Sequence, residues 1–94
     1  MMDSYLNEST KLCKENFVNW KFRMHMLMEG YNVWSILSGD EIKPTRSKIS
    51  IQDWLKRETK VKVLLRMSVK DNIIPQIREC KTSKETWEVL KGLY

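Results

Sequence analysis

The one histidine and the two cysteines are the first residues to test for chemistry, because imidazole and thiolate groups serve as bases, nucleophiles and metal ligands. His25 stands between two methionines, and Glu29 is the only carboxylate four residues from it. Cys13 and Cys80 are far apart and form neither a CxxC motif nor a Cys/His pair, which favours two reduced thiols. A metal site needs several ligands at regular spacing, and a nucleophile needs a base beside it. The sequence therefore predicts no catalytic residue, no metal site and no cofactor.

The sequence contains no motif typical of a phosphate-binding loop. Gly30, Gly39 and Gly92 are isolated, so the chain has no glycine-rich loop that could cradle a phosphate group. Serine and threonine occur mainly where helix caps and loops need them. We expect a protein that is not an enzyme and takes no small-molecule substrate.

An anionic partner is compatible with the charge pattern. The chain has 17 Lys and Arg against 12 Asp and Glu, a net charge of +5. Nine of the basic residues lie between positions 43 and 70, which could hold RNA non-specifically through its phosphates. On the helix expected there the charges spread around several faces, which is equally typical of a solvated surface. The candidates for phosphate contact are Lys43, Arg46, Lys48, Lys56, Arg57 and Lys60.

The helix expected over residues 16–29 is apolar on two sides. Phe17, Trp20, Met24, Leu27 and Met28 form one stripe at spacings of three and four. A second row follows the i, i+4, i+8 spacing on the other side. A helix that is apolar on two sides either lies centrally in its fold or offers one side to a partner. The candidates for self-association are Val18, Phe22 and Met26, with burial inside the fold as the alternative.

Helical periodicity predicts an all-α fold, a bundle of about five short helices, and no segment alternates with period two for long enough to form a strand. Residues 1–15 are expected to be a flexible N-terminal arm and residues 16–94 a helical lobe. A loop should cover residues 39–49. The helices are expected over 16–29, 32–38, 50–69, from 71 to about 80, and from 82 to the chain end.

Capping residues set these expected boundaries. Asn16 is a plausible N-cap, Gly30 should end the first helix in the left-handed conformation, and Gly39 should close the second. The third helix should open with Ser50 and Asp53, the fourth with Asp71 and Pro75, and the fifth with the capping box Thr82–Glu85.

The four tryptophans are spread along the chain as if each anchored a helix, and we expect them to meet in one interior. The predicted core consists of Trp20, Met24, Leu27, Trp34, Trp54, Val61, Leu65, Ile73, Ile77, Trp87 and Leu90.

Membrane insertion is not expected, because no apolar run approaches the roughly 20 residues that span a bilayer. The N-terminus lacks the basic and then apolar layout of a signal peptide. We therefore expect a cytoplasmic protein with no membrane partner.

The order of the aromatic residues is more informative than their number. The segment LCKENFVNWK at 12–21 precedes GYNVWSILSG at 30–39, then Trp54 opens a long helix, and TSKETWEVLKGLY ends the chain at 82–94. Together these segments resemble the N-terminal part of the Gag polyprotein of copia-type (Ty1/copia) LTR retrotransposons. The family pattern is similar to L-x-G-x-N-[YF]-x-x-W-K at the first segment and T-[AS]-x-E-x-W-x-x-L-x-x-x-Y at the last. Lys14 stands where the family usually has Gly.

The resemblance spans residues 11–94 and implies a non-enzymatic, capsid-type N-terminal lobe. It implies self-association into a homo-oligomeric shell, or entry into assemblies of related Gag proteins. The chain would then be a fragment of a longer Gag or a shortened, host-retained (domesticated) relative. Two alternatives stay open: a basic helical domain that binds nucleic acid, and a capsid-derived adaptor whose groove binds peptides.

Overall fold

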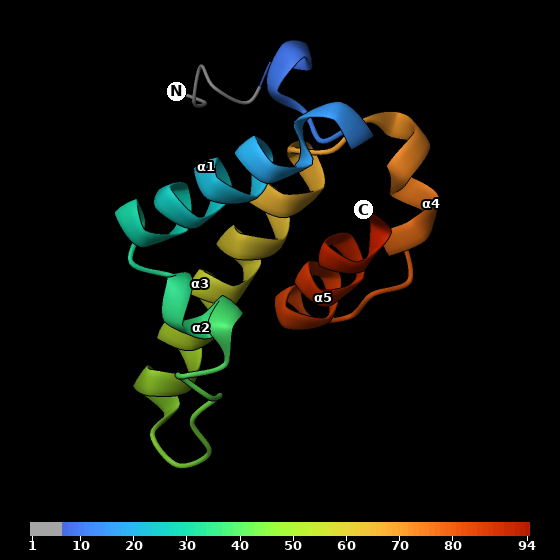
Figure 1. Ribbon diagram of the computed structural model, residues 1–94. Coiled ribbons are helices and arrows are strands. Elements are labelled where there is room, and N and C mark those ends of the chain that lie inside the picture. The colour runs from blue at the N-terminus through green and yellow to red at the C-terminus, as the bar shows by residue number, and fades with distance from the viewer. Residues whose placement is uncertain (1–6) are drawn as a thin grey trace.

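Packing must hold these helices together, because the chain contains no alanine, the residue with the highest helix propensity. The computed structural model describes residues 7–94, and this range has the predicted all-α fold (Figure 1). The three longer helices begin and end within two residues of their expected bounds. The helices and 3₁₀ turns are η1 (Glu8–Thr10), η2 (Lys14–Asn16), α1 (Phe17–Gly30), α2 (Trp34–Ser38), α3 (Lys48–Met67), η3 (Asp71–Ile73), α4 (Ile74–Ile77) and α5 (Ser83–Leu93).

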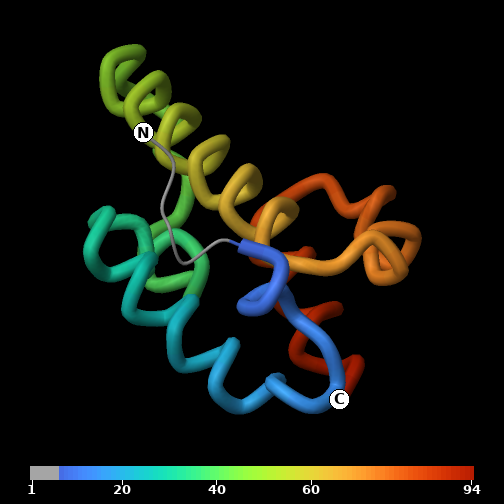
Figure 2. Tube along the Cα trace, turned by 90° about the horizontal axis from the view of Figure 1, so that it is seen from above, coloured from blue at the N-terminus to red at the C-terminus, as the bar shows by residue number. Residues whose placement is uncertain are grey.

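The two longest helices run along different edges of the fold, α1 along one and α3 along another (Figure 2). The C-terminal helix α5 packs against α2, α3 and α4, and α2 also contacts α1 and α3. The short α2 thus contacts each of the three longer helices. Within residues 7–94, one side of α1 and one side of α3 carry exposed side chains.

Two helix ends differ from the prediction. Gly30 remains within α1, and the residue in the left-handed conformation is Asn32, with φ of 61°. Asparagine tolerates this conformation better than most residues, so the turn needs no glycine at that position. The N-cap of α3 is Ser47 and not Ser50, since the Ser47 hydroxyl accepts a hydrogen bond from the Ser50 N–H at 3.2 Å.

The ends around α4 and α5 follow the sequence more closely. Pro75 lies in the first turn of α4, where its missing N–H costs little, although Asp71 begins the 3₁₀ turn η3 instead of capping the helix. Thr82 caps α5 by accepting from the Glu85 N–H at 3.0 Å. The Glu85 carboxylate reaches back to the Lys81 N–H at 2.9 Å, one residue before the position expected for a capping box.

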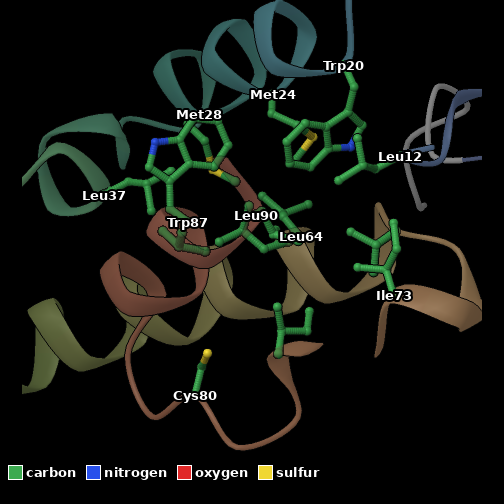
Figure 3. Close-up of a cluster of buried hydrophobic side chains, with 14 of the residues drawn as sticks. Leu12, Trp20, Met24, Met28, Leu37, Leu64, Ile73, Cys80, Trp87 and Leu90 are labelled. Carbon is green, nitrogen blue, oxygen red and sulfur yellow. The ribbon is translucent and has the colours of Figure 1, made fainter. Parts of the chain in front are cut away.

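The core lies where α1, α3 and α5 meet (Figure 3). The indoles of Trp20 and Trp87 stack with ring centroids 5.6 Å apart, and Trp34 meets Trp87 edge-on at 5.9 Å. Leu27 and Trp34 are only partly buried and pack against this core from outside. Of the predicted core residues, those fully buried are Trp20, Met24, Val61, Leu65, Ile73, Ile77, Trp87 and Leu90.

Trp54 does not join the other three indoles, which differs from the expectation of one shared interior. It is half-buried on the N-terminal half of α3 and lies outside the core cluster. It lines a depression with Ile36 of α2 and Ile42 of the following loop. This end of α3 extends past the point where α5 and α1 pack, so its indole covers the loop instead of filling the core.

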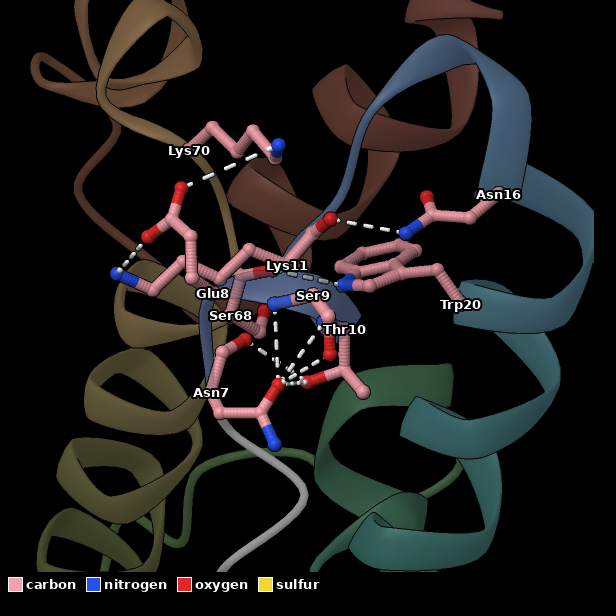
Figure 4. Close-up of polar contacts among 9 residues, drawn as sticks. All are labelled: Asn7, Glu8, Ser9, Thr10, Lys11, Asn16, Trp20, Ser68 and Lys70. Atoms are coloured by element: carbon pink, nitrogen blue, oxygen red, sulfur yellow. Dashed lines mark hydrogen bonds and ion pairs between the residues drawn. The ribbon is translucent and has the colours of Figure 1, made fainter.

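Residues 10–13 of the expected arm are buried or half-buried against the lobe, the neighbouring residues 7–9 contribute to the turn η1 (Figure 4), and residues 1–6 lie outside the described part of the chain. Leu12 is fully buried, and its N–H donates to the Ser68 carbonyl at 2.8 Å. The Asn7 side chain accepts from the Ser9 N–H at 3.0 Å and begins the turn η1. A buried leucine with a backbone hydrogen bond holds this segment in place, so the lobe begins before residue 16.

A buried carboxylate of α3 is hydrogen-bonded to the first residue of α5. Glu58 is 5% exposed and accepts hydrogen bonds from the Ser83 N–H at 2.8 Å and from the Ser83 hydroxyl. Ser83 is the first residue of α5, where N–H groups lack partners within the helix. A negative charge at this end is also favoured by the helix dipole. Glu58 therefore fixes where α5 begins relative to α3.

We expect Ile77→Asp to unfold the lobe, because Ile77 is 1% exposed and an unpaired charge would be placed among apolar neighbours. The free energy of unfolding, measured by urea denaturation with tryptophan fluorescence, should fall by more than about 3 kcal/mol. The neighbouring Gln76 is exposed, so Gln76→Asp is the matched control and should change it by less than about 0.5 kcal/mol. An Ile77→Asp variant with the wild-type denaturation midpoint would contradict this placement of the core.

Candidate interaction surface

The structure places the second apolar row of α1 on the outside of the lobe. The inner stripe of α1, including Trp20 and Met24, is buried, so the opposite side of the helix points away from the core. Val18 is 73% exposed, Phe22 66% and Met26 56%. Burial of this row inside the lobe, the alternative left open by the sequence, is therefore excluded. Three large apolar side chains at i, i+4 and i+8 form one exposed face, here called the α1 row.

A groove of about 520 Å³ runs beside the α1 row, between α1, α2 and α5. Val18 and Phe22 of α1 line it, together with Trp34 of α2 and Trp87 of α5. The His25 ring stacks on Trp34 with centroids 3.7 Å apart, and so extends the aromatic surface. The remaining lining residues are Leu37 and the polar Lys21, Ser38, Glu88 and Lys91.

His25 has a packing role in this groove. Besides stacking on Trp34, its Nε2 lies 3.4 Å from the Glu29 carboxylate, and 44% of its side chain is exposed. Within residues 7–94 no group of three His, Cys, Asp or Glu is placed to hold a metal ion. In the same range no helix combines the length and apolar character needed to cross a membrane.

The six candidate phosphate contacts fall into two groups. Lys43, Arg46, Lys48 and Lys56 are exposed on the loop before α3 and on its first turns. Lys60 lies 4.1 Å from the centre of the Tyr31 ring, a cation–π contact that favours one position of its side chain. Arg57 is part of a hydrogen-bonded network described below. Five of the six cations are therefore exposed, with Lys60 beside the Tyr31 ring, and Arg57 alone is partly buried.

Arg57 joins α3 to the turn and the loop on either side of α2. Its guanidinium donates to both carboxylate oxygens of Glu41, at 2.6 and 2.9 Å, and to the Asn32 carbonyl at 2.7 Å. Glu41 also accepts from the Ser35 hydroxyl at 2.8 Å, and Asp53 lies 3.7 Å from the guanidinium. Two parallel hydrogen bonds to a carboxylate define its orientation as well as its charge. Arg57 therefore stabilises the fold, a role that the sequence analysis missed.

The same contacts shift the ionisation of both partners. Hydrogen bonds from Arg57 and then from Ser35 lower the pKa of Glu41 below 4.5. The hydrogen bond with Glu41 raises the pKa of Arg57. Positions 41 and 57 are too far apart for helix spacing to pair them, so the sequence carries no local signal for this contact.

These observations define a small helical domain with an outward apolar row, an aromatic groove and no clustered metal ligands in the described range. A family model described as the gag-polypeptide of LTR copia-type matches residues 24–94. The chain belongs to this copia-type Gag family, a structural class of polypeptide. The resemblance found in the sequence is thus confirmed, over a shorter range than 11–94. Neither the search of curated proteins nor that of solved structures finds a match.

We expect Glu41→Gln to destabilise the lobe at neutral pH and to have less effect in acid. The folded-state pKa of Glu41 is lowered, so the ion pair stabilises the fold above the ordinary pKa of 4.5. This contribution is lost as the pH falls through the lowered folded-state value. Denaturation of wild type and variant across this range should show their difference in unfolding free energy shrinking towards acid. A difference that is constant or grows in acid would contradict the role of the ion pair.

Proposed function

We propose that this chain is a capsid-type Gag lobe that associates with copies of itself, or with related Gag proteins, through the α1 row. The observation that carries the proposal is the exposure of Val18, Phe22 and Met26 on one face of α1 in a chain of the copia-type Gag family. The role proposed is structural and cytoplasmic, with no catalytic step and no cofactor.

Physical chemistry supports this use of the α1 row. Covering apolar surface contributes about 25 cal/mol per Å², and contiguous exposed apolar side chains often mark an interface. Phe22 has the character of an anchor residue, because an exposed aromatic ring can insert into a partner and lose little conformational entropy. The groove beside it offers a depression into which a partner side chain could fit.

We expect Phe22→Asp to weaken self-association at least about tenfold, because a charge would replace the central apolar side chain of the α1 row. Sedimentation velocity over a concentration series measures this. Ile42 is 80% exposed on the loop after α2, so Ile42→Asp is a control with the same chemistry elsewhere and should associate like wild type. Wild-type protein that stays monomeric at the highest concentration, or a Phe22→Asp variant that associates normally, would contradict the proposal.

Peptide binding in the groove is a second candidate, favoured by the aromatic side chains that line it. Phe22, Trp34 and Trp87 line the groove, and the basic Lys21 and Lys91 line it as well. A short segment with an apolar side chain and a nearby carboxylate would match this lining. Titration of such a peptide, followed by tryptophan fluorescence, tests this candidate. An unchanged signal would end it.

Nucleic-acid binding is a third candidate, favoured by the four basic residues that remain exposed before and at the start of α3. Wild-type protein should retain mixed-sequence single-stranded RNA in a gel shift at low salt and release it steeply as salt rises. Replacing Lys43, Arg46 and Lys48 by Glu should abolish retention. Replacing Lys14, Arg78 and Lys81 by Glu makes the same change in net charge at other exposed positions and should reduce it less. An equal loss in both variants would show that net charge alone attracts the RNA.

A further inference from the structure

The loop after α2 and the first turn of α3 carry the two most exposed large apolar side chains of residues 7–94. Ile42 is 80% exposed and Ile49 79%, and neither belongs to the core cluster or packs against it. They bracket the segment 42–49, here called the basic segment, which projects at the lower end of the molecule in Figure 1. A single exposed isoleucine is common, but two at a projecting end indicate a contact with something outside the fold.

The charge between the two isoleucines is positive. The exposed cations of the basic segment are Lys43, Arg46 and Lys48. Its sequence, IKPTRSKI, contains no carboxylate, and among residues 7–94 no Asp or Glu forms an ion pair with these cations. The nearby Glu41 and Asp53 both face the guanidinium of Arg57. Asp40 is exposed beside the segment, and the three cations outnumber it.

Both ends of the basic segment are held by hydrogen bonds. Just before it, the Glu41 N–H donates to the Ser35 carbonyl at 3.0 Å. Near its other end, the Ser47 hydroxyl caps α3 by accepting from the Ser50 N–H at 3.2 Å. Pro44 restricts the backbone between these two points. Docking through this segment therefore costs less conformational entropy than docking through a free loop.

Aliphatic and basic side chains together match the surface of an anionic lipid bilayer. The aliphatic side chains can enter the boundary between headgroups and acyl chains, while lysine and arginine attract anionic headgroups. Single-stranded RNA would use the same cations, but its bases stack on aromatic rings, and residues 42–49 contain none. The two isoleucines therefore favour a membrane over a nucleic acid.

We propose that the basic segment docks this lobe on the surface of a membrane that contains anionic lipid, with Ile42 and Ile49 at the headgroup boundary. The expectation of no membrane partner rested on the lack of a spanning segment and of a signal peptide, and surface docking needs neither. The contact uses no residue of the α1 row, so it goes beyond the proposed self-association and does not depend on it. Each cation near an anionic surface strengthens binding about fivefold, and salt screens this attraction.

Sedimentation with lipid vesicles tests the apolar part of this contact. The chain should bind vesicles of phosphatidylcholine with about one-quarter phosphatidylserine, and bind pure phosphatidylcholine at least about tenfold more weakly. The double change Ile42→Ser and Ile49→Ser keeps the net charge and should weaken binding to the anionic vesicles at least about tenfold. Val63→Ser with Met67→Ser is the matched control, because these two exposed side chains lie near the other end of α3, and it should bind like wild type.

The charged part of the contact is tested with two triple variants of equal net charge. Replacing the three cations of the basic segment by Glu should abolish vesicle binding, and replacing the exposed Lys14, Arg78 and Lys81 by Glu should reduce it less. An equal loss in both would mean that net charge alone attracts the vesicles, and the inference would fail. Circular dichroism checks the helix content of each variant. Should the isoleucine double variant lose helices, Ile42→Ser alone must weaken binding at least about threefold.

The remaining outcomes separate this inference from the other proposals. A wild-type chain that does not bind the anionic vesicles, or an isoleucine variant that binds them as well as its control does, would overturn it. Retention of RNA without vesicle binding would assign the basic segment to nucleic acid instead. Without lipid, the isoleucine variant should self-associate like wild type, and a joint loss of both properties would show that the segment acts between copies. A monomeric wild type that binds vesicles would contradict the proposed function and leave this inference standing.

Discussion

The placement of the Trp20 indole is the constraint on which the arrangement of α1 depends. Its ring packs on Trp87 of α5, and its Nε1–H donates to the Ser68 carbonyl just past the end of α3, at 2.9 Å. The same carbonyl accepts the Leu12 N–H, so one backbone oxygen joins the N-terminal segment, α1 and α3. A buried indole whose N–H is satisfied fixes the rotation of its helix as well as its position. Once Trp20 points inward, helical periodicity directs Val18, Phe22 and Met26 outward.

Hydrogen bonds to charged side chains position α3, α5 and the loop after α2, where the tryptophans do not pack. Glu58 holds the start of α5 against α3, and Arg57 holds the loop after α2 through Glu41. The two residues are neighbours on α3 but point in different directions, because successive helical residues are about 100° apart around the axis. Both sets of hydrogen bonds lie at helix ends or in loops, where backbone groups lack partners within a helix. The middles of α1 and α3 contribute apolar side chains to the core.

Much of the fold follows from local sequence patterns, and most of the polar network does not. The inner stripe of α1 and the Thr82 cap of α5 are read from neighbours in sequence, and the structure has both. The Glu41–Arg57 and Glu58–Ser83 contacts join residues 16 and 25 positions apart, so only the folded chain brings them together. Leu12 belongs to no helical period, because it lies in the segment between η1 and η2 and forms an isolated β-bridge with Val69. The prediction that Trp54 lies in the core was wrong. A tryptophan in the sequence indicates that its ring will be partly buried, but not which element will pack on it.

The exposed α1 row was predictable only in part, again because its environment depends on contacts between distant segments. A row of apolar residues on one helix is visible in sequence, but whether it faces the core depends on which other helices reach it. The α1 row and its inner stripe have similar apolar character, and the choice between them is made by the indoles of α1 and α5. Leu55, Val63 and Met67 lie between lysines and arginines of α3, and long basic side chains beside apolar ones are typical of an ordinary solvated helix. The structure removes Arg57 from that solvated set, because Glu41 holds its guanidinium in a contact between residues that helical spacing does not pair.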